Sequence, residues 1–273
     1  SEVRFQYEPI AAAFHYEERA TREQTVIVAD IGGGTSDFSV VRVGPERRGR
    51  VDRRGDILAS HGVHSAGTDF DRRVELARIL PALGYGAFGP PRRGGGAPLE
   101  VPSRVYFDLA TWHLINTVYR PQRLMEIAAM RDDYADPRLH ARLMTTLRDR
   151  LGHALAGLAE EAKIAVAQGG AHDIDLFEVE RGLRATVTEA EAADAIGDEL
   201  ERIVGAARET ARLAGLRATG IDALYFTGGS TGLRLLAERL SDAFPHARPM
   251  HGDRFASVAT GLGLDAQRHF SHR

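Results

Sequence analysis

The most restrictive feature of this sequence is a run of three glycines between two apolar, β-branched segments, in "TVIVADIGGGTSDFSVVRV" (residues 25–43). The flanking segments predict strands at 26–29 and 38–43, joined by a glycine turn. A tight turn needs one or two glycines, so a third indicates that a large group approaches the backbone. Glycine lacks a Cβ and tolerates positive φ, so successive N–H groups can face one concavity that binds an anion, phosphate above all.

Two carboxylates flank this turn. Asp30 ends the first strand, Asp37 begins the second, and Thr35 adds a hydroxyl donor. A carboxylate beside a phosphate is repelled unless a cation lies between them, a role that suits Mg²⁺ with its retained waters. Asp37 could instead orient an attacking water, and a plain hairpin turn is the remaining alternative. The pattern is neither a Walker A loop, since no G-K-[ST] follows, nor a dinucleotide fingerprint, since a strand comes next.

A second glycine turn lies in "ALYFTGGSTGLRLL" (residues 223–236), which predicts a strand, a turn and a helix. A helix N-terminus binds anions, and Gly228 and Gly229 would let a ligand lie close to the backbone. The same stretch satisfies G-x-S-x-G, with Ser230 as the nucleophile of an α/β-hydrolase. The segment after it is predicted to be helical with little sheet for the other triad members, so the hydrolase is the weaker hypothesis.

Composition narrows the function classes. The 273 residues carry a net charge of -3, with 43% hydrophobic and 27% charged residues and no cysteine. Disulfides and thiolate chemistry are therefore excluded, and nothing global indicates a nucleic-acid partner. We find no membrane-length apolar run and no signal-peptide pattern, so we expect a cytoplasmic protein without membrane contact. His61 and His64 lack a third ligand at zinc spacing.

The remaining pattern predicts an α/β fold with a helical insertion. A third strand is expected at 56–63, helices at 69–83 and through 103–168, and a hairpin bending at Arg181–Gly182. Ser103 is expected to cap a helix, and residues 137–166 to form a single helix of about eight turns. Thr188 and Glu191 predict a capping box for a helix to Leu213. We expect an α/β core at 1–62 and 188–273 and an insertion subdomain at 63–187.

Five segments in order, "EPIAAAFHYE", "VIVADIGGGTSDFSVV", "GTDFD", "EEAK" and "YFTGGSTGL", give the chain a specific likeness. It resembles the C-terminal half of the ATPase domain of the seventy-kilodalton heat-shock chaperones (DnaK type), and among them the short YegD-like bacterial relatives. The resemblance implies lobe II of an actin-like (ribonuclease H-like) ATPase fold. It also implies ATP or ADP with Mg²⁺ as ligands, and client proteins or co-chaperones as partners.

The resemblance also implies roles for individual residues. Asp30 would hold Mg²⁺ through water, Asp37 would align the nucleophilic water, and Glu8 would face the metal waters. The γ-phosphate would be wrapped by Gly32, Gly33, Gly34 and Thr35. Gly67 would sit near the phosphates. Glu160 and Lys163 would reach the ribose and adenine side from a helix, and the adenosine pocket would be lined by Gly228, Gly229 and Ser230. Lys163 is the single lysine among 35 basic residues.

Departures from the family pattern open alternatives. Ile164 and Gly232 stand where the family sandwiches adenine between two arginines, and Phe255 replaces an acidic residue. A non-hydrolysing scaffold and a filament-forming actin-like ATPase therefore remain alternatives to the chaperone-type ATPase. The family's first phosphate loop and catalytic lysine are expected before residue 1. We therefore expect the chain to be a truncated domain with negligible ATP hydrolysis, able to dimerise through the last helix (Val258, Leu262 and Leu264).

Overall fold

The computed structural model describes residues 3, 5–18, 20–50, 52–92, 94–252 and 256–270. The chain divides into two compact units, one of residues 1–67 with 198–273 and one of residues 68–197. Strands and helices are mixed, which confirms the expected α/β class. Within the described ranges, no helix combines the length and apolar character needed to span a bilayer.

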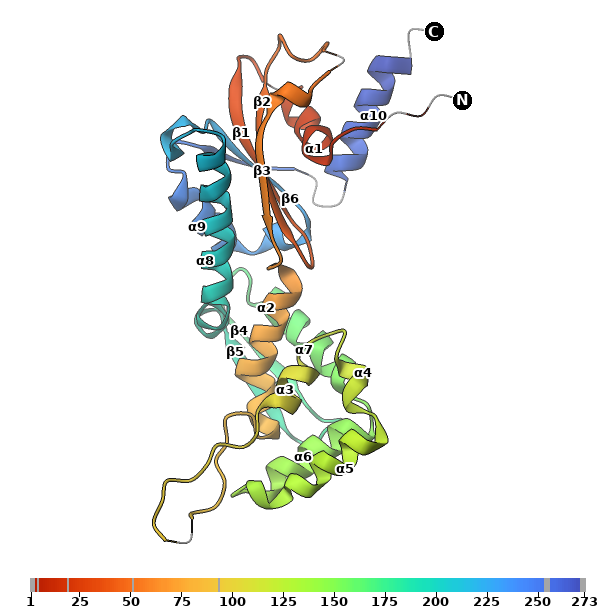
Figure 1. The fold of residues 1–273 in the computed structure, drawn as a ribbon, viewed down its shortest axis with the longest axis vertical. Helices are drawn as coiled ribbons and strands as arrows, with labels where there is room; N and C mark the ends of the chain where they lie inside the picture. Colours follow the sequence, from red (N-terminus) through yellow and green to blue (C-terminus); the bar gives the residue numbers. More distant parts are fainter. Residues whose placement is uncertain are drawn as a thin grey trace. The chain divides into compact units, whose positions relative to one another are not determined.

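A five-stranded mixed sheet is the centre of the first unit (Figure 1). Its order is β3-β2-β1-β6-β7, with β1, β2 and β3 antiparallel and β1, β6 and β7 parallel. The strands are β1 (Gln24–Ile31), β2 (Ser36–Val43), β3 (Ile57–Val63), β6 (Ala223–Thr227) and β7 (Arg248–His251). The strands predicted at 26–29, 38–43 and 56–63 are confirmed, and β1 lies at the junction of the antiparallel and parallel parts.

Two helices cover one face of this sheet. Helices α1 (Glu8–Glu17) and α10 (Ser257–Phe270) pack with Val26, Val28 and neighbouring strand residues in one buried cluster. A Cβ at Gly261 would overlap the carbonyl of Ala11, so glycine at that position permits close contact of the two backbones. Val258 and Leu264 pack on this cluster, whereas Leu262 is exposed. Of the three apolar residues of the last helix expected at a dimer surface, only Leu262 is therefore exposed to solvent.

Successive side chains of β1 point to opposite faces of the sheet. Those on the face away from α1 and α10 are buried as well, so β1 is shielded from solvent on both faces. Figure 1 shows α9 (Arg234–Ala243) and the 198–213 part of α8 (Glu189–Leu213) on the side of the sheet away from α1 and α10. Three-residue 3₁₀ turns lie at Arg54–Asp56 and Ala218–Gly220, and a longer one at Gly229–Gly232.

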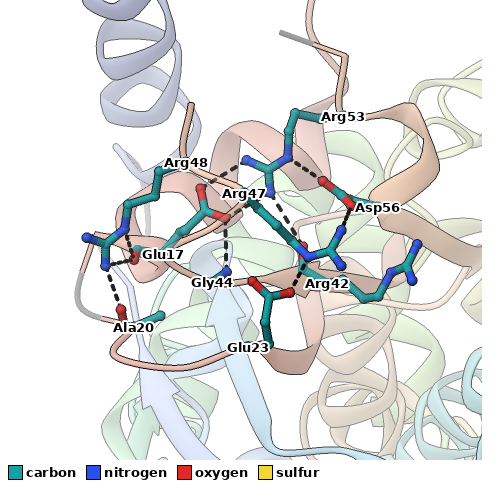
Figure 2. A network of polar contacts seen from close by, with 9 residues as sticks. All are labelled: Glu17, Ala20, Glu23, Arg42, Gly44, Arg47, Arg48, Arg53 and Asp56. Atoms are coloured by element: carbon teal, nitrogen blue, oxygen red, sulfur yellow. Dashed lines mark hydrogen bonds and ion pairs between the residues drawn. The ribbon is translucent and has the colours of Figure 1, made fainter. Parts of the chain in front are cut away.

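A buried ionic network ties the end of α1 to the strand connections (Figure 2). Arg53 donates two hydrogen bonds of 2.9 Å to the carboxylate of Glu17, and neither side chain is more than 2% exposed. Arg53 also pairs with Asp56, which Arg47 contacts in turn. Arg48 donates to the main-chain carbonyl of Glu17, the last residue of α1, and to that of Ala20 just beyond the helix.

The second unit is mostly helical. Its elements are α2 (Gly67–Val74, beginning at the unit boundary), α3 (Arg104–Leu109), α4 (Ile115–Val118), α5 (Pro121–Ala129), α6 (Pro137–Arg148), α7 (Gly152–Ala165), β4 (Ala171–Asp175) and β5 (Arg184–Thr188). A π-helical turn, Glu75–Ile79, and a 3₁₀ turn, Leu80–Leu83, continue α2, and another 3₁₀ turn lies at Met130–Asp133. The predicted hairpin is confirmed as the antiparallel pair β4–β5.

The prediction of one helix over 137–166 is wrong. Helix α6 ends at Arg148, and Arg150 takes the left-handed conformation with φ 55°. The N–H of Leu151 donates to the carbonyl of Thr146, five residues back, which is the hydrogen bond of a Schellman motif at the C-terminus of α6. Helix α7 then starts at Gly152, so the apolar spacing continues across a break in the backbone.

Two capping predictions have different outcomes. Thr188 and Glu191 form the expected capping box, since the Glu191 carboxylate accepts from the Thr188 N–H at 2.9 Å and the Thr188 hydroxyl accepts from the Glu191 N–H at 3.3 Å. Ser103 precedes α3, but its side chain makes no capping hydrogen bond, and the helix is short. Trp112 lies beyond its end and is 62% exposed.

Candidate functional site

The glycine turn joins β1 to β2 through residues 32–35, closed by a hydrogen bond of 3.0 Å from the Gly32 N–H to the Thr35 carbonyl. None of the three glycines has a positive φ, so the turn does not use the left-handed backbone that glycine tolerates. A Cβ at Gly34 would meet nothing within 4 Å, and one at Gly32 would make only an ordinary contact of 3.8 Å. Neither conformation nor packing therefore explains glycine at these two positions, whereas a group that approaches the bare backbone from outside does.

Three carboxylates gather beside this turn. Asp30 and Asp37 are direct cross-strand partners, and Glu8 is the first residue of α1. Burial, followed by the negative charges of Glu8 and Asp37, raises the pKa of Asp30 above its ordinary value. Like charges placed directly opposite on two strands are destabilising. The arrangement therefore works against the fold unless a cation relieves it.

The chemistry of this cluster fits a hydrated cation better than a directly bound one. Among the residues that the structure describes, no three His, Cys, Asp or Glu side chains are placed to ligate a metal ion directly. Mg²⁺ keeps several of its waters when bound to proteins, so separated carboxylates can hold it through them. The expectation that Asp30 acts through water is compatible with this geometry.

A cavity of about 350 Å³ opens between the carboxylates and the strands. Besides Glu8, Asp30 and Asp37, its walls include four residues that the sequence did not assign to a phosphate site, which are Ser39, Ser60, His61 and Gly62. Gly62 is the β3 partner of Asp37, and a Cβ at Gly62 would overlap the Asp37 carboxylate. A glycine inside the third predicted strand was the sequence signal for a close contact at this position. That it faces Asp37 depends on the β2–β3 register, which the sequence does not give.

The second glycine turn packs directly on the first. The Gly32 carbonyl accepts hydrogen bonds from the Gly67 N–H at 3.2 Å and from the Ser230 hydroxyl at 2.7 Å. Gly67 is also tightly packed, since a Cβ there would lie 2.5 Å from the Ser230 hydroxyl oxygen. Three residues predicted from separate motifs, Gly32, Gly67 and Ser230, thus meet at one carbonyl group.

Gly228 has a structural reason to be glycine. Its φ is 86°, and a Cβ would overlap the Ile31 carbonyl and lie 2.7 Å from an Asp30 carboxylate oxygen. Gly229 is exposed and opens the 3₁₀ turn that ends at Gly232, so α9 starts only at Arg234. The expected direct strand–turn–helix passage therefore includes an extra turn.

The hydrolase hypothesis finds no support in this arrangement. A serine nucleophile needs an adjacent base, usually a histidine. The Ser230 hydroxyl instead donates to the Gly32 carbonyl and holds the two turns together. His251, a histidine that follows Ser230 in the chain, stacks on Phe226 with ring centroids 5.1 Å apart.

The residues expected near the nucleoside also include two in the second unit. Glu160 and Lys163 lie on α7, with Glu160 exposed. The Lys163 ammonium forms an ion pair of 2.6 Å with Asp71, and both side chains are less than one-fifth exposed. Ile164 is 61% exposed, and Phe255 lies outside the described residues.

Comparisons with known proteins agree with the likeness of the motifs. The chaperone protein HscA of Pectobacterium atrosepticum is 26% identical over 265 residues, which are 97% of this chain and 32% of HscA. An HscA homologue of a Shewanella species is 25% identical over 266 residues, with the same shares. DnaK of Thermotoga neapolitana is 41% identical over 69 residues, 24% of this chain and 10% of DnaK. The chain is similar to the seventy-kilodalton heat-shock chaperones over almost its whole length.

The mixed five-stranded sheet is consistent with an actin-like ATPase lobe of these heat-shock chaperones. The chain spans about a third of the length of the HscA relatives, 32% in each case. No family profile matches the chain. The likeness to the heat-shock chaperones is therefore carried by individual relatives together with the ordered motifs.

Proposed function

We propose that this chain is the nucleotide-binding lobe of a chaperone-type ATPase, and that the turn 32–35 binds the phosphates of ATP or ADP. The observation that carries the proposal is the cluster of Glu8, Asp30 and Asp37 beside a turn in which neither packing nor backbone conformation requires glycine at Gly32 and Gly34. Such carboxylates cost stability without a cation, and a turn without side chains lets an anion approach the backbone. A nucleotide phosphate accompanied by Mg²⁺ supplies both charges at once.

Each residue has a distinct part in this proposal. The backbone N–H of Gly34 and the hydroxyl of Thr35 would donate hydrogen bonds to the terminal phosphate. Gly32 and Gly33 would complete the wrap around it by letting it lie close to the backbone, since the Gly32 N–H is held by the Thr35 carbonyl. Asp30 would orient metal-bound water, with Glu8 facing the same waters. Mg²⁺, when bound, would neutralise charge that develops on the phosphate oxygens. Asp37 would accept a hydrogen bond from the attacking water and so align it with the phosphorus atom.

The nucleoside contacts are a finer part of the proposal. Gly228, Gly229 and Ser230 would line the adenosine pocket, since Gly228 and Ser230 pack against the phosphate turn. Gly67 would lie near the phosphates, since its N–H donates to the Gly32 carbonyl. Glu160 and Lys163 would approach the ribose and adenine. Lys163 is held by Asp71, so its ammonium has a fixed position on α7.

A specific observation keeps the scaffold as a second candidate. The two positions at which the family uses arginine to sandwich adenine are Ile164 and Gly232, and neither offers a cation. A chain that keeps the fold and has lost the nucleotide would show this loss. The filament-forming alternative is less favoured because the second turn reads Gly-Gly-Ser-Thr rather than three glycines.

The experiment is ATP turnover by the full-length natural protein and by its Asp37→Asn variant. We expect the substitution to lower the turnover number by roughly a hundredfold or more, as for loss of a group that aligns the nucleophile. A matched control is Asp222→Asn, since Asp222 lies before β6 and pairs with Arg22. Unchanged turnover in Asp37→Asn would contradict the role assigned to Asp37. Absence of turnover by the full-length natural protein would favour the non-hydrolysing scaffold. By itself, the 273-residue chain is expected to hydrolyse ATP negligibly.

A further inference from the structure

A second cavity, of about 440 Å³, lies wholly within the second unit. It is bounded by α2 and its π-helical extension, by the segment after α3, and by α7. Its polar and aromatic wall residues are Thr68, Asp69, Asp71, Arg72, Glu75, Thr111, Trp112, His113 and Glu160. Except for Glu160, none of them has a part in the proposed nucleotide site.

The deepest of these side chains is an unsatisfied acid. Glu75 is 1% exposed, and its Oε1 atom has no hydrogen-bond partner. Burial, followed by the charge of Asp71, raises the pKa of Glu75 to about 8. A buried carboxyl group without a partner is costly, and here it stands in the wall of a cavity. A ligand group that donates to Oε1 would remove that cost.

A second wall residue, Arg72, has a buried donor without an acceptor. The Nε–H of Arg72 is buried and has no acceptor, although the guanidinium lies over the Phe107 ring at 5.9 Å. The cavity thus presents one unmatched acceptor or acid and one unmatched donor. A ligand with an ammonium group at one point and a carboxylate at another matches both.

The surrounding charge favours a ligand with more than one ammonium group. Four acidic residues line the walls against one arginine, and Lys163 is committed to Asp71. The acids do not converge on a point, since no three of the described His, Cys, Asp or Glu residues could hold a metal ion together. Separated acids with small apolar walls, Ala110, Ala156 and Gly157, suit an aliphatic chain with charged ends better than a metal ion.

We propose that this cavity binds a basic α-amino acid, whose ammonium groups contact Glu75 and the outer carboxylates and whose carboxylate contacts Arg72. Trp112, at the exposed side of the cavity, offers an aromatic surface to a cation. Ammonium binding would favour the ionised form of Glu75, so binding at pH 7 releases a proton. The other titratable or charged groups near Glu75 are Asp71, Arg72, His113, Tyr119 and Glu160.

The test uses the fluorescence of Trp112, the only tryptophan of the chain, during titration with L-lysine. Two analogues test the charged groups of lysine separately: norleucine lacks the side-chain ammonium, and cadaverine lacks the carboxylate. We expect saturable binding of lysine and affinities at least about tenfold weaker for both probes, the size of a lost charged hydrogen bond. Equal binding of lysine and cadaverine would contradict the assigned role of Arg72, and no saturable response to lysine would overturn the proposal.

Variants separate the cavity from the surface charge of α7. Glu75→Gln keeps the shape of the side chain and is expected to weaken lysine binding at least about tenfold. Ala156→Leu fills the cavity without a change in charge and is expected to abolish binding. Glu161→Gln, exposed on α7 outside this cavity, is the control and is expected to bind as the wild type does. An equal loss in Glu161→Gln would show unspecific attraction and contradict the proposal, and circular dichroism checks that each variant folds.

Discussion

At the scale of single residues, the fold requires glycine at some positions of the two glycine turns and not at others. Gly34 has open space and no positive φ, whereas Gly228 has a φ of 86° and no room for a Cβ. We expect Gly34→Ala to leave the free energy of unfolding unchanged or slightly higher and to weaken nucleotide binding. Gly228→Ala should lower that free energy by about 1–3 kcal/mol, the cost of a strained left-handed residue.

Urea unfolding and nucleotide titration of both variants check this contrast. A large loss of stability in Gly34→Ala would mean that glycine is required by the fold there. In that case the argument for an external group at the turn would fail. Gly228→Ala serves as the positive control for a structural glycine.

The carboxylates beside the turn give a pH-dependent prediction. Because the pKa of Asp30 is raised in the folded state, the folded chain holds the proton more tightly than the unfolded chain. The stability associated with protonated Asp30 is therefore present at low pH and is lost as the pH rises from the ordinary Asp range through the raised pKa. We expect Asp30→Asn to raise the free energy of unfolding at pH 7 by roughly 0.5–1 kcal/mol without divalent metal, the size of a like-charge cross-strand pair.

Unfolding at pH 4 and pH 7 in the presence of a chelator measures this effect. The advantage of Asp30→Asn should shrink at pH 4 and should also shrink when Mg·ADP is added. Glu46→Gln, in the exposed turn after β2, is the control and should change neither value. A variant that is less stable than the wild type at both pH values would contradict the repulsion argued for this cluster.

Sequence reasoning at this scale was good at selecting residues and poor at finding their neighbours. Gly32, Gly67 and Ser230 were selected from three motifs and share one carbonyl. Gly62 was missed because its relation to Asp37 depends on the β2–β3 register. Glu75 was missed because a lone glutamate in a helical pattern indicates a solvated face, and only the packing of the second unit shows it buried.

At the scale of elements, the network of Figure 2 makes the strongest stability prediction. Arg53 is the bidentate partner of Glu17, and both side chains are buried. Arg53→Ala removes the cation that neutralises the buried Glu17 carboxylate, so we expect a loss of about 3–5 kcal/mol in the free energy of unfolding. Thermal or urea unfolding measures it.

Two further variants test the reason for that loss. Arg54→Ala, which removes an exposed arginine next along the chain, should unfold at the wild-type temperature. Replacing both members of the pair, as in Glu17→Leu with Arg53→Met, should recover much of the loss because no unpaired charge remains. A double variant no more stable than Arg53→Ala would contradict the explanation.

Helix and strand types were predictable because apolar spacing and capping residues are local signals. The strands around the glycine turn and the capping box at Thr188 are confirmed. The break between α6 and α7 was not predictable, since the apolar spacing continues through it and left-handed Arg150 carries none of the usual glycine signal. Leu143 and Leu147 are buried on α6 as a core stripe requires.

At the scale of the whole molecule, five ordered motifs were enough to predict the relationship to heat-shock chaperones, which the comparisons support. Motif order is a property of the chain and needs no coordinates. The cavity beside Glu75 is a different case, because its walls come from α2, α7 and the segment after α3. Such a site depends on tertiary packing of segments that have no motif of their own.

The most direct test of the central claim is calorimetric titration of ADP into the full-length natural protein, with and without Mg²⁺. The account predicts micromolar binding, about -8 kcal/mol, that depends on Mg²⁺. It also predicts weaker binding by the stably folded Gly34→Ala variant. Absence of detectable binding, or binding indifferent to both Mg²⁺ and Gly34→Ala, would contradict the assignment of the turn 32–35 as a phosphate site.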